Sequence, residues 1–139
     1  MMASVDPTRA ERIVTEPDPY DQFNRIGIPG WQPRFLSGQT SIDEHGEVVG
    51  VGDFDLQAEQ TFENLRRVLE AAGSSLEKRI KVNIYLTDMG NFPKIVDLRE
   101  KYFKQPWPGD TITGVTGLAL PELMIEIEAV ALVNGEVVG

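Results

Sequence analysis

Acidic side chains are the main candidates for chemistry in this sequence, because the other usual catalytic groups are scarce. The chain of 139 residues contains no cysteine and one histidine, His45. Without cysteine there is neither a thiolate metal site nor a cysteine nucleophile. His45 lies in the turn cluster 43–46, where a surface residue is expected rather than a catalytic base. Ser37 therefore lacks a histidine partner, which excludes a Ser-His nucleophile and leaves a hydrogen-bonding role.

Two carboxylates, Glu126 and Asp110, each have a functional and a structural interpretation. Glu126 is either an acid or base in a pocket or a strand carboxylate that pairs with Lys81 across the sheet. Asp110 follows Pro-Gly and either faces Glu126 in a cleft or bonds nearby backbone amides in a turn. In a shared cleft, mutual repulsion would raise the pKa of one carboxyl and leave a protonated acid beside an ionised base. Such a pair could also hold a cationic amine or a divalent ion, but without histidine no metal site is expected.

Two arginines could bind an anionic ligand, and for both a structural role is favoured. Arg99 stands beside Glu100 and Lys101 in a helical pattern, which is typical of a surface residue. Arg34 precedes Ser37 by three residues, and strand alternation directs these two side chains to opposite faces.

Hydrophobic periodicity predicts two helices. Apolar residues recur at spacings of three and four between Asp55 and Gly73, with Gly73 placed as a C-cap. A second helix is predicted after Asn91, which can cap its first turn, and it ends before Pro106 and Pro108. The apolar side of the second helix is expected to carry Phe92, Ile95, Val96, Tyr102 and Phe103.

Alternating apolar and polar residues predict the strands. Residues 80–87, 111–116 and 123–133 each follow the period of a strand. Residues 35–49 predict a hairpin, and the Pro-rich stretch 16–33 predicts an ordered loop. In the last strand, one face carries Ile125, Ile127, Ala129, Ala131 and Val133, and the other carries Met124, Glu126, Glu128, Val130 and Leu132.

The order of these elements predicts one α+β domain over residues 1–139. The length suits a single hydrophobic core. The order is two or three strands, helix, strand, helix, strand, strand. This order places two helices on one face of a mixed sheet. The other face, with Val130 and Leu132 beside Glu126 and Glu128, should be closed by other subunits, because an apolar stripe of that size is not normally left in water.

Charge and hydropathy limit the partners and the location. The net charge is -9, so nucleic acid would be repelled and is not an expected partner. No apolar run approaches the roughly 18 residues of a membrane span, and the first residues lack the apolar region of a secretory signal. A cytoplasmic protein with no membrane association is expected.

Four short segments carry a resemblance to a known family. They are Ser37-Gly38-Gln39, the helix end 68–73, Phe92 followed by Tyr102-Phe103, and the strand 125–131. In this order and spacing they resemble the RidA/YjgF family, also named YjgF/L-PSP, from Ile13 to Val133. The resemblance implies a chorismate-mutase-like α+β fold and a homotrimer with an inner barrel of sheets, outer helices and small-molecule clefts between subunits.

The resemblance also implies an activity and its residues. Members with known chemistry hydrolyse reactive enamines and imines derived from amino acids, without a metal or organic cofactor. An arginine grips the ligand's carboxylate, and a glutamate helps to direct water at the imine carbon. Carried over residue by residue, Glu126 falls on the water-positioning glutamate and Ser37 on the pocket serine. Tyr20 falls on the pocket tyrosine, with Phe23 as a substitute because the following loop is longer here.

The sequence departs from the family at several pocket positions. Asp110 occupies the arginine position, Ile112 replaces a cysteine found in many members, and Val96 aligns with an asparagine. Arg99 appears one turn further along the second helix, where a tyrosine is common. The predicted catalytic residues are thus Glu126 and Asp110, and the predicted substrate-binding residues are Tyr20, Ser37, Arg99 and Ile112.

Two functions are compatible with these departures. The first is a deaminase for an enamine or imine with an altered charge pattern, from an aromatic ring-cleavage (aminomuconate-type) or amino-acid catabolic pathway. The second is a trimeric small-molecule-binding protein without turnover. The endoribonuclease activity that some family labels carry is disfavoured, because the chain is acidic and has no pair of histidines for acid-base cleavage.

Overall fold

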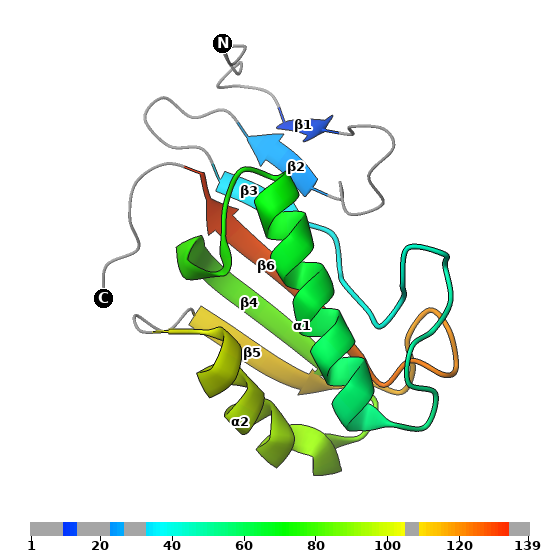
Figure 1. Ribbon diagram of the computed structural model, residues 1–139. Helices are drawn as coiled ribbons and strands as arrows, with labels where there is room; N and C mark the ends of the chain where they lie inside the picture. The colour runs from blue at the N-terminus through cyan, green and yellow to red at the C-terminus, as the bar shows by residue number, and fades with distance from the viewer. Residues whose placement is uncertain (1–9, 14–22, 27–32, 105–108, 134–139) are drawn as a thin grey trace.

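The strands form one mixed sheet, as the pattern of elements predicts (Figure 1). The computed structural model describes residues 10–13, 23–26, 33–104 and 109–133. The sheet order is β1-β2-β3-β6-β4-β5, in which β4 and β5 are parallel and every other neighbouring pair is antiparallel. The elements are β1 (Ala10–Ile13), β2 (Phe23–Ile26), β3 (Pro33–Leu36), α1 (Phe54–Ala71), β4 (Arg79–Leu86), α2 (Phe92–Tyr102), β5 (Gly109–Gly114) and β6 (Ile125–Leu132), with short 3-10 turns η1 (Leu76–Lys78) and η2 (Met89–Asn91).

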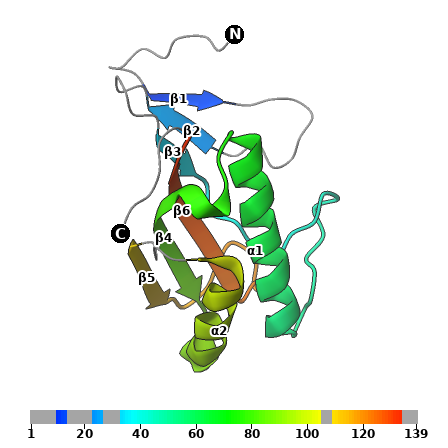
Figure 2. The same cartoon turned by 60° about the vertical axis from the view of Figure 1, so that its left-hand side comes forward.

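Helices α1 and α2 lie on the same face of the sheet, so the predicted arrangement of two helices on one side is confirmed (Figures 1 and 2). Helix α1 begins at Asp53, whose side chain accepts a hydrogen bond from the backbone N–H of Leu56. Its C-cap is Ala72, and the next residue, Gly73, adopts φ +78°. The backbone N–H groups of Gly73 and Ser74 donate to the carbonyls of Glu70 and Leu69, and this pairing satisfies the last turn of the helix.

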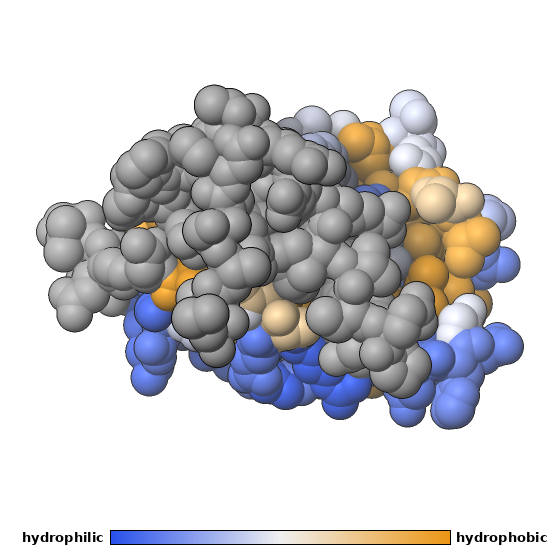
Figure 3. All heavy atoms as spheres, turned by 90° about the horizontal axis from the view of Figure 1, so that it is seen from above, coloured by the Kyte–Doolittle hydropathy of each residue, from blue (hydrophilic) through white to orange (hydrophobic). Residues whose placement is uncertain are grey.

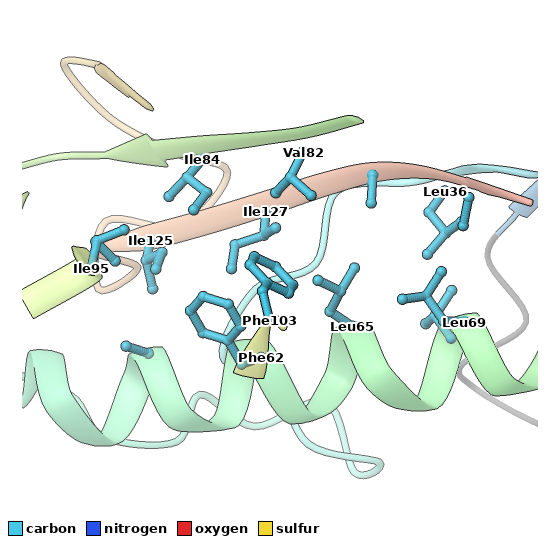
Figure 4. Packing of buried hydrophobic residues seen from close by; sticks show 14 of the residues in the cluster. Leu36, Phe62, Leu65, Leu69, Val82, Ile84, Ile95, Phe103, Ile125 and Ile127 are labelled. Atoms are coloured by element: carbon cyan, nitrogen blue, oxygen red, sulfur yellow. The ribbon is translucent and has the colours of Figure 1, made fainter. Parts of the chain in front are cut away.

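The core fills the space between α1 and the two central strands, β4 and β6 (Figure 4). Phe62 of α1 stacks on Tyr102 with ring centroids 4.8 Å apart and meets Phe103 edge-on at 5.6 Å, so the two helices share one aromatic cluster. Each large apolar side chain removed from water contributes about 1.5–3 kcal/mol. The fully buried members include Leu65 and Leu69 of α1, Val82 and Ile84 of β4, and Ile125 and Ile127 of β6.

Two buried amides of α1 fix the segments that lead into β6 and away from β3. Gln57 donates to the carbonyls of Gly50 and Glu122, and its own Oε1 accepts from the backbone N–H of Met124 at 2.9 Å. Asn64 donates to the carbonyls at positions 40 and 42. Buried polar groups are costly when left unpaired. The bonds of Gln57 therefore hold the start of β6 in place, and those of Asn64 hold the segment that follows β3.

Several local predictions differ from the structure. The predicted loop 16–33 contains β2, which pairs with both β1 and β3. The predicted hairpin 35–49 is reduced to a single bridge between Ile42 and Val48, because β3 ends at Leu36 and pairs with β6 instead. A register irregularity between Arg79 and Lys81 buries Arg79, whose guanidinium carbon lies 5.1 Å from the centroid of the Phe103 ring.

The start of α2 also differs from its prediction. Asn91 stands at the N-cap position, but its side chain makes no capping bond, and the preceding η2 turn is capped by Asp88 instead. Of the predicted apolar side, Ile95 and Phe103 are buried, whereas Phe92 and Val96 are exposed. An 11-residue helix at the edge of the sheet turns only a narrow stripe towards the core.

Seen from above, hydrophilic residues of the described part collect along one edge and hydrophobic residues gather at one end (Figure 3).

Neither α1 nor α2, the two α-helices of the described ranges, has the apolar length that a membrane crossing requires.

Candidate functional site

Polar side chains of β4 and β6 meet on the face of the sheet that the helices leave uncovered. Ile125 and Ile127 are buried towards α1, so strand alternation places Glu126 and Glu128 on the other side. In the antiparallel pair, Tyr85 is opposite Glu126 and Asn83 is opposite Glu128. We call this surface the open face; the polar described residues that β4, β5 and β6 place on it are Lys81, Asn83, Tyr85, Thr111, Thr113, Glu126 and Glu128.

Glu126 is half-buried against the glycine of the Ser-Gly-Gln segment. A Cβ added at Gly38 would lie 2.8 Å from the Glu126 carboxyl carbon and would overlap its Oε1. The φ of Gly38 is not positive, so this position requires glycine for space rather than for backbone conformation. Burial raises the pKa of the Glu126 carboxyl above its ordinary value, and the charge of Glu128 raises it further. A partly buried carboxyl whose charged form is disfavoured is a candidate for general acid-base chemistry.

Glu128 is anchored by two donors from β4. Asn83 Nδ2 and Tyr85 Oη donate to the same oxygen, Oε1, at 2.9 Å and 2.6 Å. The hydrogen bond to Glu128 is the main cause of a raised pKa of the Tyr85 phenol. The Glu128 carboxylate is therefore fixed in direction beside Glu126.

Lys81 lies further along the open face and does not pair with Glu126. Its register partner on β6 is Val130, and its Nζ donates to Thr111 Oγ1 of β5 at 2.9 Å. The Lys81–Glu126 pairing considered from the sequence is thus wrong, because strand register separates the two residues. A hollow of about 220 Å³ lies on this part of the sheet, lined by Phe35, Leu36, Lys81, Asn83, Glu128, Ala129 and Val130.

Asp110 and Ile112 point to the helix side of the sheet, away from Glu126 in the same chain. In the parallel pair Asp110 lies beside Val82 and Ile112 beside Ile84, and neighbours in register share a face. Within one chain Asp110 therefore does not face Glu126, and a cleft between subunits that contains both carboxylates stays a prediction. Ile112 packs against the edge of the core, so within one chain it does not contact the open face.

Asp110 forms an ion pair with Arg99 of α2. Arg99 Nη2 lies 2.6 Å from Asp110 Oδ2, and the side chains are 24% and 17% exposed. The contact is close but is not aligned as a hydrogen bond, and among the described residues Arg99 Nε and Asp110 Oδ2 are buried without a hydrogen-bond partner. Neither structural role considered for these residues holds: Arg99 is partly buried rather than a surface residue, and Asp110 contacts a helix.

The remaining predicted residues are spread over the fold. Ser37 is exposed after the end of β3, and its carbonyl accepts a bond from Gln39. Arg34 is 2% exposed and donates to the carbonyl of Ala72, so it lies on the helix side, as alternation predicts. Tyr20 lies outside the described residues, as does the side chain of Phe23.

Comparison with known proteins identifies the family. The model of the Endoribonuclease L-PSP family matches residues 14–133. The chain belongs to this family. The resemblance of this chain to the RidA/YjgF family, also named YjgF/L-PSP, is thereby confirmed.

Individual relatives of this L-PSP chain cover most of its length. A RutC family protein of Pyrococcus horikoshii is 42% identical over 81% of this chain and 86% of its own. A 2-iminobutanoate/2-iminopropanoate deaminase of Dermatophagoides farinae is 29% identical over 89% of this chain and 98% of its own. The crystal structure of RidA from an Antarctic Psychrobacter species superposes with a TM-score of 0.71 at 30% identity, covering 87% of this chain and 94% of that one.

Four residues of the L-PSP site were not predicted from the sequence. Gly38 was noted only as part of a motif, and Asn83, Tyr85 and Glu128 were not assigned to the site. Alternation alone shows that each of these three strand residues lies on a polar face. It cannot show that the two polar faces are brought side by side in register, and that pairing creates the network.

Replacing Gly38 with alanine should displace Glu126 without unfolding the protein. The obstructed group is the end of a flexible side chain, so it can swing into solvent. We expect the Glu126 carboxyl to titrate at lower pH in Gly38→Ala, since solvation favours the charged form. Carbon-13 NMR of the side-chain carboxyls measures this directly. Gly117→Ala is the control, because nothing lies within 4 Å of its added Cβ; an unchanged Glu126 titration in Gly38→Ala would contradict the packing described here.

Proposed function

We propose that this protein is a hydrolytic deaminase that converts an unstable enamine or imine of a small metabolite into a carbonyl compound and ammonia. The observation that carries the proposal is the placement of Glu126, half-buried against Gly38 with a raised pKa. The mite relative bears the name of an imine deaminase, which supports the same reaction class.

Glu126 is the proton-exchanging group in the proposed reaction. In its protonated form it donates a proton to the enamine carbon, which produces an iminium. In its ionised form it accepts a proton from the water that attacks the iminium carbon. Glu126 gives that proton to the nitrogen of the resulting carbinolamine, and ammonia leaves as the C–N bond breaks. The hydroxyl proton then passes to the ionised Glu126, which leaves the carbonyl and restores the protonated carboxyl. No step consumes an oxidant or reductant, and we propose that no cofactor takes part.

The site is proposed to be completed by other copies in a homotrimer. Glu126 and Asp110 of one chain lie on opposite faces of the sheet, so they can share a cleft only across a contact between two copies. The open face carries Val130 and Leu132 besides its polar residues, and an apolar surface of this kind is commonly covered. Such a cleft combines the open face of one copy with the edge formed by β5 and α2 of the next, and Ser37, Ile112 and Tyr20 are proposed to line it.

A second candidate function is small-molecule binding without turnover. The Asp110–Arg99 ion pair favours it, because Arg99 is already paired and a carboxylate stands at the position of the family's ligand-binding arginine. Saturable binding without ammonia release would favour this alternative. A cytoplasmic location, the ring-cleavage or amino-acid pathway and the identity of the metabolite stay predictions.

The trimer is tested by light scattering. At micromolar concentration the full chain should give three times the chain mass of 15.5 kDa. A stable monomer would remove the proposed cleft between copies, since neither Asp110 nor Ile112 reaches the open face of its own chain.

The role of Glu126 is tested by Glu126→Gln. The amide keeps the shape of the side chain and removes the exchangeable proton, so we expect normal folding and assembly with a rate loss of roughly 10² to 10⁴. Ammonia release is measured on the best substrate among enzymatically generated enamines and imines, aminomuconate-type compounds included. Glu122→Gln, at an exposed position just before β6, is the control. Full activity of Glu126→Gln would show that another group handles the proton.

The effect of the negative charge at position 110 of β5 is tested by exchanging the two residues of the Arg99–Asp110 ion pair. The natural protein should release negligible ammonia from 2-iminopropanoate, because a carboxylate near the ligand's carboxylate can cost several kcal/mol, or roughly a hundredfold or more in affinity. Arg99→Asp combined with Asp110→Arg keeps opposite charges in contact and sets a guanidinium on β5, where it can grip a carboxylate in bidentate fashion. We expect this double variant to gain activity or affinity for 2-iminopropanoate.

Asp110→Arg alone is the matched control, since it brings two guanidinium groups together and should gain less than the double variant. Robust release by the natural protein would contradict the prediction and would show that Asp110 does not meet the ligand's carboxylate.

A further inference from the structure

We infer that Glu128 is a positioning residue for Glu126: Asn83 and Tyr85 hold the Glu128 carboxylate beside Glu126 on the open face, so that its negative charge acts on the proposed proton-exchanging group. This inference rests on the proposed function for its catalytic meaning, but its physical content can be tested without turnover. It concerns a residue that sequence reasoning did not assign to the site.

The anchoring of Glu128 is specific in geometry. Asn83 and Tyr85 are two residues apart on β4 and lie on the same face of the sheet. Asn83 Nδ2 and Tyr85 Oη both donate to one oxygen of Glu128. Tyr85 is the register partner of Glu126, yet its hydroxyl reaches diagonally to Glu128. The Tyr85 hydroxyl thus donates to Glu128 rather than to Glu126, and the Glu126 carboxyl lies next to Gly38.

Glu128 is also the nearest described charge on the face that Glu126 occupies. Residues two apart on a strand have Cα atoms about 6.5–7 Å apart on the same face. The other charged group on this face is Lys81. It lies opposite Val130, which follows Glu128 by two residues on β6, and its Nζ donates to Thr111. The segment after β3 presents Ser37 and Gly38, and β5 presents Thr111 and Thr113, none of which carries a charge. The ionisable groups facing Glu126 from these described elements are therefore Glu128, Tyr85 and, more distantly, Lys81.

A fixed carboxylate beside a half-buried one favours a proton on the second, because two negative charges at this separation repel each other. The raised pKa of Glu126, caused by burial and then by Glu128, agrees with this reading.

Glu128→Gln tests the inference with a defined sign. Loss of the neighbouring charge should move the titration of the Glu126 carboxyl to lower pH, because a nearby negative charge disfavours its ionised form. Carbon-13 NMR of the full-length protein follows Glu126 directly, with its signal assigned from Glu126→Gln. Glu100→Gln removes an equal charge from an exposed position on α2 and should leave the Glu126 titration unchanged. An unchanged titration in Glu128→Gln, or an equal shift in Glu100→Gln, would overturn the inference.

The anchor is tested in the same variant by ultraviolet titration of the tyrosines. Because Glu128 raises the pKa of Tyr85, one of the three tyrosines should ionise at lower pH in Glu128→Gln and at its natural pH in Glu100→Gln. Unchanged tyrosine titration would contradict the anchoring.

The kinetic reading separates this inference from the proposed function. If Glu126 exchanges the proton, the limb of the rate profile that belongs to it should move to lower pH in Glu128→Gln, whether Glu126 acts as acid or base. A shifted NMR titration with an unshifted rate profile would retain the coupling and reject Glu126 as the proton-exchanging group. An unshifted NMR titration with a large rate loss in Glu126→Gln would reject the coupling and retain the function.

Discussion

The antiparallel register between β4 and β6 is the constraint on which the rest of the site depends. It sets Tyr85 opposite Glu126 and Asn83 opposite Glu128 on one face, while Ile84 and Ile127 meet on the other. Side chains alternate along a strand, so a slip of one residue would send the carboxylates into the core and the isoleucines into solvent. The apolar core under α1 therefore fixes the polar network above it, and neither face can change register alone.

This division explains why the two acids singled out from the sequence have different surroundings. Glu126 is partly buried and lies beside the negative charge of Glu128, so its charged form is disfavoured. Asp110 lies against a guanidinium on the other side of the sheet, where its negative charge is balanced. A chemical role for Asp110 thus depends on assembly, whereas the environment of Glu126 is already established within one chain.

The sequence was sufficient for the two helices and the central strands, and insufficient for the short strand β2 and for the lateral contacts of the strands. The period of residues 54–71 and the glycine at 73 predict α1 closely, and the alternation in residues 123–133 predicts the two faces of β6. Alternation in residues 111–116 could not show which face carries Asp110, because that depends on the parallel pairing with β4. β2 was missed because its four residues lie in a Pro-rich stretch, and short strands are defined by their partners more than by their own pattern. The resemblance to a family identified Glu126, but strand pairing was needed to find Tyr85 and Glu128.

The close approach of Glu126 to Gly38 links two positions that are 88 residues apart in the chain. Since the backbone at Gly38 is ordinary for any residue, the demand for glycine comes from the neighbouring side chain alone. The two positions should consequently covary among relatives: a protein that keeps the glutamate must keep the glycine, and one that has exchanged the glutamate for a shorter residue is released to accept alanine or serine. An alanine or serine at this position would then mark, from sequence alone, a relative whose pocket no longer holds the acid in this place.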